Sequence, residues 1–259
     1  MSTRQPSGGG MRAITISRQY GSGGGEIGTR LAARLNWRLI DHELVAQVAR
    51  ELGITERTAE AHDEYTEGFI ARLLSRQAVY PLTPAVEYAA ELTPYHHAEE
   101  HRYQETLRHV VETAADSGQV VIIGRASQVI LAQRRDVLHV RVVAPFQARI
   151  AYVAVREGLD EASARARVEL KDRDRSRYLQ TVYHHHVDDP MLYDLVINTG
   201  VLSLDKAVEL IFQALEGKAE TLSRPSEQVG PARGLARYAG RPGDIRPPAR
   251  LTDTQSPSS

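Results

Sequence analysis

The fold of this chain is decided by the stretch Ile14-Thr15-Ile16-Ser17-Arg18-Gln19-Tyr20-Gly21-Ser22-Gly23-Gly24-Gly25-Glu26-Ile27-Gly28. The apolar run 13–16 predicts a strand, and the periodic apolar residues in 26–35 predict a helix, with glycines between the two. Glycines let successive backbone N–H groups point into one concavity, and the helix N-terminus adds partial positive charge, so this arrangement can hold phosphate. We therefore expect a nucleotide-phosphate loop at the start of an α/β domain.

The loop departs from the Walker A motif, Gly-x-x-x-x-Gly-Lys-Ser/Thr. Arg18 stands at the position of the leading glycine, Gly24 at that of the lysine, and Glu26 where nucleoside monophosphate kinases carry a hydroxyl. Two interpretations stay open. The loop is either a P-loop variant in which Arg18 supplies the missing cation, or a glycine-rich turn that binds no ligand.

Composition and net charge limit the classes of protein to which this chain can belong. The chain has 259 residues, 42% of them hydrophobic, which suffices for one large domain or two small ones. A formal net charge of −1 gives no sign of bulk attraction to nucleic acid or membrane, and the absence of cysteine excludes disulfides and thiolate chemistry. No apolar run approaches 18 residues, and the Ser/Gly-rich N-terminus lacks an apolar signal core. We expect a cytoplasmic enzyme that binds neither nucleic acid nor membrane; its oligomeric state is left open.

Four further apolar runs predict strands, at 37–41, 119–123, 137–143 and 194–198. Helical patterns separate them, over 99–115, around 149–153, over 158–178 and over 204–215. Strands that alternate with helices predict a parallel, doubly wound sheet.

Two charged residues follow predicted strands directly. The carboxyl ends of strands in an open α/β sheet face the ligand crevice, so Asp41 and Arg125 are candidates for ligand contact. A guanidinium there can bind a phosphate through two hydrogen bonds. The alternatives are that Asp41 caps the helix that follows it and that Arg125 forms a salt bridge to a neighbouring helix.

The chain divides into three parts. Residues 1–11 are expected to form a flexible leader, 12–216 a domain, and 217–259 a disordered tail rich in Pro, Arg, Gly and Ser. Within the domain, 43–117 is mostly helical and reads as an insertion between strands, a usual place for a segment that covers substrate.

Three stretches together resemble the cytidylate kinase-like family of P-loop kinases. The first is 16–24 with Asp41 downstream, the second is Gly124-Arg125, and the third is 172–178 followed by 193–200. The resemblance runs from about Arg12 to Leu215.

The resemblance implies a P-loop NTPase fold of the nucleoside monophosphate kinase type, with five parallel strands wrapped by helices and a mobile helical lid at about 158–190. It implies ATP-dependent phosphoryl transfer, with Mg²⁺, to a nucleoside monophosphate, CMP or dCMP in this family. The implied ATP-binding residues are Arg18, Gly21, Ser22, Gly23, Gly24, Gly25 and Glu26. The implied substrate-binding residues are Asp41, Arg125 and Asp174, and the implied catalytic residues are Arg18, Arg173, Arg175 and Arg177.

The chain also departs from the family pattern. The P-loop lysine is absent, Ala126 replaces the aspartate that helps to read cytosine, and Leu170 stands at the leading arginine of the lid motif. Two other functions therefore stay open. One is a nucleotide-binding regulatory module that has lost catalysis, and the other is a kinase for a different small acceptor.

Two groups of histidines invite a metal site. The adjacent residues 184–186 cannot converge on one ion, and we expect them to form a polar hinge. His97 and His101 have helical spacing but no evident third ligand, so no resident metal is predicted.

Overall fold

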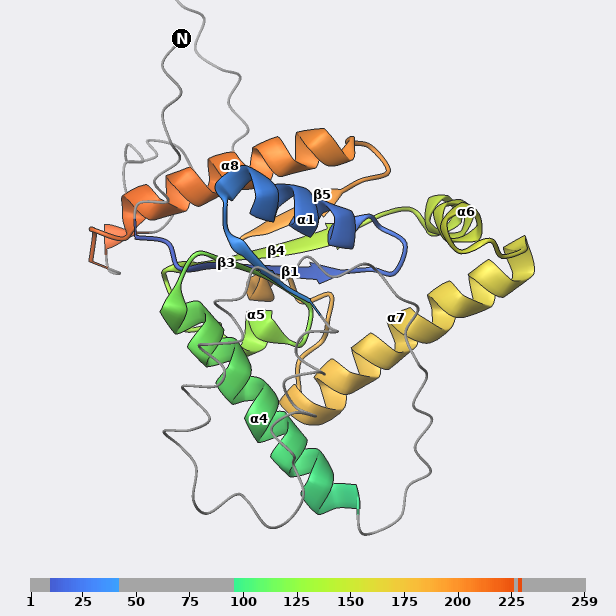
Figure 1. Cartoon of the computed structure of the whole chain (residues 1–259), viewed down its shortest axis with the longest axis horizontal. Helices are drawn as coiled ribbons and strands as arrows, with labels where there is room; N and C mark the ends of the chain where they lie inside the picture. Colours follow the sequence, from blue (N-terminus) through green and yellow to red (C-terminus); the bar gives the residue numbers. More distant parts are fainter. Residues whose placement is uncertain (1–9, 42–95, 226–227, 230–259) are drawn as a thin grey trace, which may run out of the picture. The chain divides into compact units, whose positions relative to one another are not determined.

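The computed structural model describes residues 10–41, 96–225 and 228–229, with backbone only for 96–103 (Figure 1). The predicted leader up to residue 9, the helical pieces between 43 and 95, the helix that Asp41 would cap and the tail from 230 onward lie outside the described residues.

Five parallel strands form one sheet in the order β2-β3-β1-β4-β5. Their bounds are β1 Ala13–Arg18, β2 Arg38–Ile40, β3 Val120–Ile123, β4 Val137–Val143 and β5 Leu195–Asn198. The glycine-loop strand β1 lies in the middle, paired with β3 on one side and β4 on the other. The predicted five-stranded parallel sheet wrapped by helices is confirmed.

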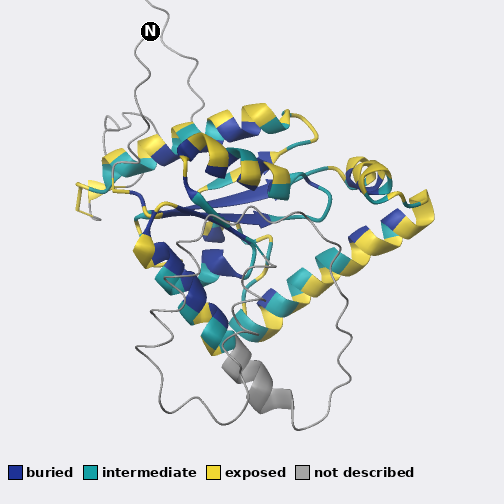
Figure 2. Cartoon of the chain, in the orientation of Figure 1, coloured by how far each residue is buried: buried dark blue, intermediate teal, exposed yellow. Residues whose placement is uncertain are grey.

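Helices cover both faces of the sheet (Figure 1). Alternate strand residues point to opposite faces, and the two buried clusters follow this alternation. Ile14, Ile16 and Val140 pack with α1 (Gly24–Leu35) and α8 (Leu204–Thr221), and Ala13 and Ile122 pack with α4 (His96–Ser117). The short helix α5 (Ser127–Ile130) follows β3. Figure 2 shows the central strands dark blue, as expected for strands covered on both faces.

A helical hairpin follows β4. It consists of α6 (Phe146–Glu157) and α7 (Glu161–Tyr183), and the short 3₁₀ helix η1 (Pro190–Leu192) comes after it. The predicted helix 158–178 is wrong at its start, because Gly158 adopts a left-handed conformation that ends α6 and Asp160 caps α7 by accepting from the Ser163 N–H at 2.9 Å. α7 then continues to Tyr183, five residues beyond the predicted end.

Other boundaries differ by a few residues. Ser203 caps α8 as predicted, but the helix runs to Thr221 rather than Leu215, with Gly217 inside it. Met11, assigned to the leader, is buried in the core beside α1. None of the helices in the described ranges is long and apolar enough to cross a membrane.

Candidate functional site

The loop between β1 and α1 owes its backbone conformation to its glycines. Gly21 and Gly23 both have φ of +78°, a left-handed conformation that other residues rarely adopt. The Ser22 hydroxyl lies underneath and donates to the Gln19 carbonyl at 2.8 Å, and the Thr199 hydroxyl donates to the Ser22 carbonyl at 2.8 Å. The serine hydroxyl is therefore used to shape the loop, and a ligand could meet only the backbone of this residue.

Arg18 fits into space left by two glycines. A Cβ on Gly24 would lie 2.8 Å from the Arg18 Cβ, and a Cβ on Gly124 would lie 2.8 Å from the Arg18 Nη1. The Arg18 stem thus passes beneath the first residue of α1, and its guanidinium reaches the turn after β3. The Walker lysine position is glycine because the arginine from the end of β1 fills the neighbouring space.

The Arg18 guanidinium lies in a strongly positive environment. Burial, together with the nearby charges of Arg175 and Arg125, lowers the pKa of Arg18 to about 9, while Asp41 opposes the shift. At this pKa the guanidinium still carries its charge at neutral pH. The structure therefore brings Arg18, Asp41, Arg125 and Arg175 within electrostatic range of one another, which is an arrangement that favours an anion.

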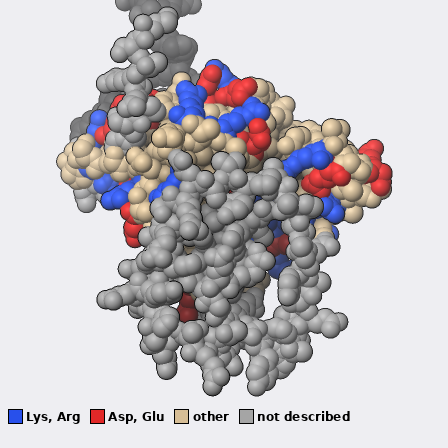
Figure 3. Space-filling view, viewed as in Figure 1, with Lys and Arg blue, Asp and Glu red and all other residues tan. Residues whose placement is uncertain are grey.

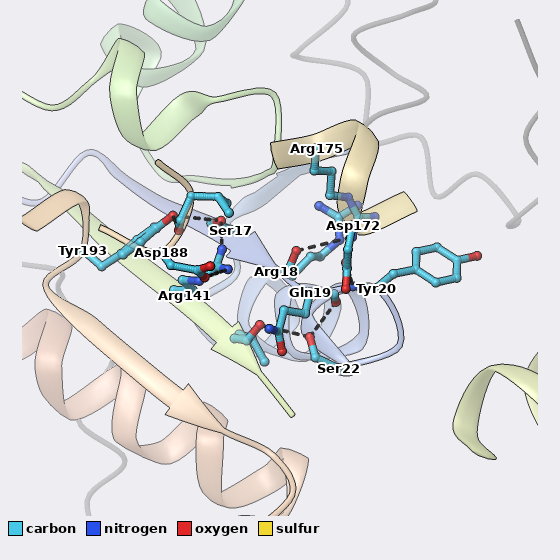
Figure 4. A network of polar contacts seen from close by, with 12 residues as sticks. Ser17, Arg18, Gln19, Tyr20, Ser22, Arg141, Asp172, Arg175, Asp188 and Tyr193 are labelled. Atoms are coloured by element: carbon cyan, nitrogen blue, oxygen red, sulfur yellow. Dashed lines mark hydrogen bonds and ion pairs between the residues drawn. The ribbon is translucent and has the colours of Figure 1, made fainter. Parts of the chain in front are cut away.

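α7 reaches the loop through Asp172 and Arg175 (Figure 4). Asp172 accepts the Tyr20 backbone N–H at 2.7 Å and pairs with the buried Arg149 of α6. Arg175 donates to the Arg18 carbonyl at 3.3 Å and lies 5.3 Å from the centre of the Tyr20 ring. Burial lowers the pKa of Arg175, and Asp172 opposes that shift.

A cleft of about 240 Å³ lies between the end of β1, β4, α7 and the segment that follows α7. Its lining includes Arg18, Gln19, Arg141, Asp172, Arg173 and Arg175. The resemblance implies roles for Arg173, Asp174 and Arg177 on this helix as well. In the structure Arg173 lines the cleft, whereas Arg177 and Asp174 are exposed on α7 and are not part of its lining.

Two more predicted residues lie at the start of α1. Glu26 is exposed and pairs with Arg30 at 2.9 Å. Gly25 faces open space, since no protein atom lies within 4 Å of where its Cβ would be.

Sequence reasoning missed three charged residues that shape this region: Arg141, Arg149 and Asp172. Arg141 lies inside an apolar strand, where the only signal was a charge within an otherwise hydrophobic run. Asp172 was one charge among many in a helix whose dense charges are typical of a solvent-exposed surface. On the face shown in Figure 3, acidic and basic side chains are interspersed over the visible helices. The lining of the cleft, in contrast, is rich in arginine.

The chain matches the Cytidylate kinase-like family over residues 13–201. Cytidylate kinase from Archaeoglobus fulgidus is 26% identical over 206 residues, which cover 79% of this chain and 95% of that protein. Cytidylate kinase from Methanopyrus kandleri is 29% identical over 111 residues, 40% of this chain and 58% of that protein. Uronate isomerase from Corynebacterium glutamicum is 30% identical over 115 residues, which cover 44% of this chain but only 22% of that protein.

Among solved structures, an uncharacterized protein from Eubacterium ventriosum superposes with a TM-score of 0.58 at 19% identity, covering 80% of this chain and 99% of that one. This likeness concerns the fold alone. The family match spans the glycine loop, the turn after β3, the basic helix α7 and the last strand β5. The chain therefore belongs to the cytidylate kinase-like family and has the fold of a nucleotide kinase.

Proposed function

We propose that the protein transfers a phosphoryl group from ATP to a nucleoside monophosphate, CMP or dCMP. The observation that carries this proposal is the position of Arg18, whose stem packs against Gly24 of the glycine loop and whose guanidinium reaches Gly124, in electrostatic range of Arg125 and Arg175. Family membership supports a phosphotransferase. The activity of the whole protein is part of the proposal, because the matched segment spans only 22% and 58% of two of its curated relatives.

The chemistry asks mainly for positioning and positive charge. In phosphoryl transfer, negative charge spreads over the equatorial oxygens of a loose transition state, so cations and N–H donors supply most of the catalysis. The amides of Gly21 to Gly25 would hold the ATP phosphates, and Arg18 would take the role of the absent lysine. Arg125 would bind the phosphate of the acceptor, and Arg175 and Arg173 would approach the transferred group from α7.

Magnesium fits this site as a companion of the nucleotide rather than as a resident ion. Position 25, which carries a hydroxyl in the Walker motif, is glycine, and the described residues include no cluster of three or more acidic, histidine or cysteine side chains. Mg²⁺ commonly keeps several waters and binds through substrate phosphates with one or two carboxylates. Asp41, in range of Arg18, is the carboxylate we assign to it. When bound, the ion would neutralise charge on the donor phosphates.

The acceptor is tested with a panel. Purified protein is incubated with ATP, Mg²⁺ and each of CMP, dCMP, UMP and AMP, and with shikimate as a small acceptor that is not a nucleotide. It should form ADP with CMP or dCMP. Arg18→Ala should lower kcat by roughly 10²–10³, the cost of removing one preorganised charge-stabilising group. Arg167→Ala, on the same helix as Arg175 but outside the cleft lining, is the matched control and should stay within a few-fold of wild type.

The outcomes separate the alternatives. Turnover with shikimate or another acceptor alone would replace the acceptor and keep the reaction class. No turnover above the Arg18→Ala variant with any acceptor would reject the kinase proposal.

A second candidate is a nucleotide-binding module without catalysis. Asp172 favours it, because this carboxylate already occupies the Tyr20 N–H at 2.7 Å and brings negative charge to the loop. Calorimetry that shows tight ATP binding together with no transfer in the acceptor panel would support this candidate over the kinase.

A further inference from the structure

Arg141 is a buried charge that the assigned roles leave unused. It lies on β4, between β1 and the edge strand β5, and its side chain is 5% exposed. Its Nη1 donates to the Ser17 hydroxyl at 3.1 Å, its Nη2 to an Asp188 oxygen at 2.6 Å, and its guanidinium lies 5.5 Å from the centre of the Tyr193 ring (Figure 4). A guanidinium inside a sheet is costly to bury, so the groups around it decide what it is there to do.

The ion pair with Asp188 is weak compensation for that cost. The Asp188 side chain is 79% exposed on the segment after α7, so its charge is largely hydrated. An exposed carboxylate returns little energy to its partner. Asp188 therefore holds the guanidinium in place without neutralising it as a buried carboxylate would.

Arg141 also opens onto the cleft. The cleft is lined by four arginines and two aspartates, and Arg141 is one of the four. One of the aspartates, Asp172, is engaged by the Tyr20 N–H and by Arg149. The charge of Arg141 also contributes to the lowered pKa of Arg175. The side chains of Arg141 and Arg175 thus line the same cleft, in which arginines outnumber aspartates.

We propose that Arg141 is a further phosphate-binding residue of the cleft, presented from β4 opposite the α7 arginines and positioned by Ser17, Asp188 and Tyr193. The ligand class is a phosphoryl group of a bound nucleotide, either the triphosphate of the donor or the monophosphate of the acceptor. The planar fork of arginine suits this role, because one edge can keep Ser17 and Asp188 while another N–H binds a phosphate oxygen. This inference rests on the proposed function, since it concerns the same cleft.

The test compares the two partners of one ion pair. Arg141→Gln removes the cation, whereas Asp188→Asn removes the charge of the carboxylate but keeps an oxygen that can accept from Arg141 and hold it in place. Binding of ATP, CMP and inorganic tripolyphosphate is measured by calorimetry, and the urea midpoint of each variant is measured alongside. We expect Arg141→Gln to weaken binding at least tenfold, and Asp188→Asn to bind as tightly as wild type or more tightly because a competing anion is gone. Weakening for ATP and tripolyphosphate assigns Arg141 to the donor, and weakening for CMP alone assigns it to the acceptor.

The proposal is overturned if both variants lose affinity equally, since Arg141 would then be only a structural tie, or if neither loses affinity. Should Arg141→Gln fail to fold, Arg141→Lys keeps the charge without the fork and should still weaken binding at least threefold. Wild-type protein that binds none of the probes would overturn the nucleotide proposal as well. Wild-type protein that binds them without transfer would reject only the kinase reaction and leave Arg141 with its ligand.

Discussion

At the scale of single residues, Arg18 and Gly24 have exchanged the residue types of a Walker loop. The arginine stands at the position of the leading glycine, and the glycine stands at the position of the lysine. In a Walker loop the cation comes from the first residues of the helix, whereas here it comes from the end of the strand. A side chain at position 24 would enter the space of the Arg18 stem, since the two Cβ atoms would be 2.8 Å apart and a Gly24 Cβ would lie 3.2 Å from the Arg18 Cδ. The two positions therefore cannot both carry large side chains.

This exchange predicts strong coupling between two substitutions. Gly24→Lys alone should destabilise the protein by about 1–3 kcal/mol, because it overpacks a filled site. In the Arg18→Gly background the same change should cost much less, which gives a coupling energy of at least about 1 kcal/mol. Urea unfolding of the four proteins in the cycle measures it. Gly25→Lys is the matched control, since position 25 faces open space, and it should be neutral or mildly stabilising. Additive effects at 18 and 24 would show that the space is not shared.

At the scale of elements, α7 is joined to the loop and to α6 by one carboxylate. Asp172 links the Tyr20 backbone to the buried Arg149, which in turn donates to the Tyr20 carbonyl at 3.1 Å. Ala164 and Val168 of α7 also pack against α6. Asp172 is therefore the centre of the polar contacts that fix the hairpin to the loop, which also include the bond from Arg175 to the Arg18 carbonyl, beside a small apolar contact.

Removing that charge should loosen α7. Asp172→Asn keeps an acceptor for the Tyr20 N–H but leaves Arg149 without its anion, so we expect a loss of about 2–4 kcal/mol in the free energy of unfolding. Hydrogen exchange at the Tyr20 amide should rise at the same time. Arg167→Gln, which breaks the more exposed Arg167–Glu157 pair between α6 and α7, should cost less than about 1 kcal/mol. Equal losses in the two variants would contradict the role given to Asp172.

The same helix shows how far sequence could predict the site. Its existence and its basic character followed from the sequence. The ligand contacts of Arg18 and Arg125 stay predictions, although the structure places these two residues within electrostatic range of each other. Which side of α7 meets the loop did not follow, because charges on every side of the helix give no apolar stripe from which to infer orientation. Arg175, rather than Arg177, faces the loop because α6 and Tyr20 fix the rotation of the helix, and these contacts are tertiary.

At the scale of the whole molecule, the sheet was predictable and its polar interior was not. Apolar runs of strand length fixed all five strands to within two residues at each end, because a central parallel strand must be apolar on both faces. His139 and Arg141 interrupt β4 on one face, and sequence alone offered no partner for either. Their partners, Thr15 and Ser17, lie 124 positions away in the chain and meet them only through the β1–β4 register.

His139 makes stability depend on pH. It is buried between strands, its Nδ1 lies 2.8 Å from the Thr15 hydroxyl, and burial lowers the pKa of His139 to about 4, against an opposing contribution from Asp194. The unfolded chain, in which this pKa is near 6.5, binds more protons between the two values, so stability is full above about pH 6.5 and is lost as the pH falls toward 4. The difference corresponds to roughly 3 kcal/mol. Urea unfolding at pH 7.0, 5.5 and 4.5 should show this loss in wild type and a smaller one in His139→Gln, which keeps a polar group opposite Thr15 but does not titrate. Parallel pH profiles for the two proteins would contradict the role given to His139.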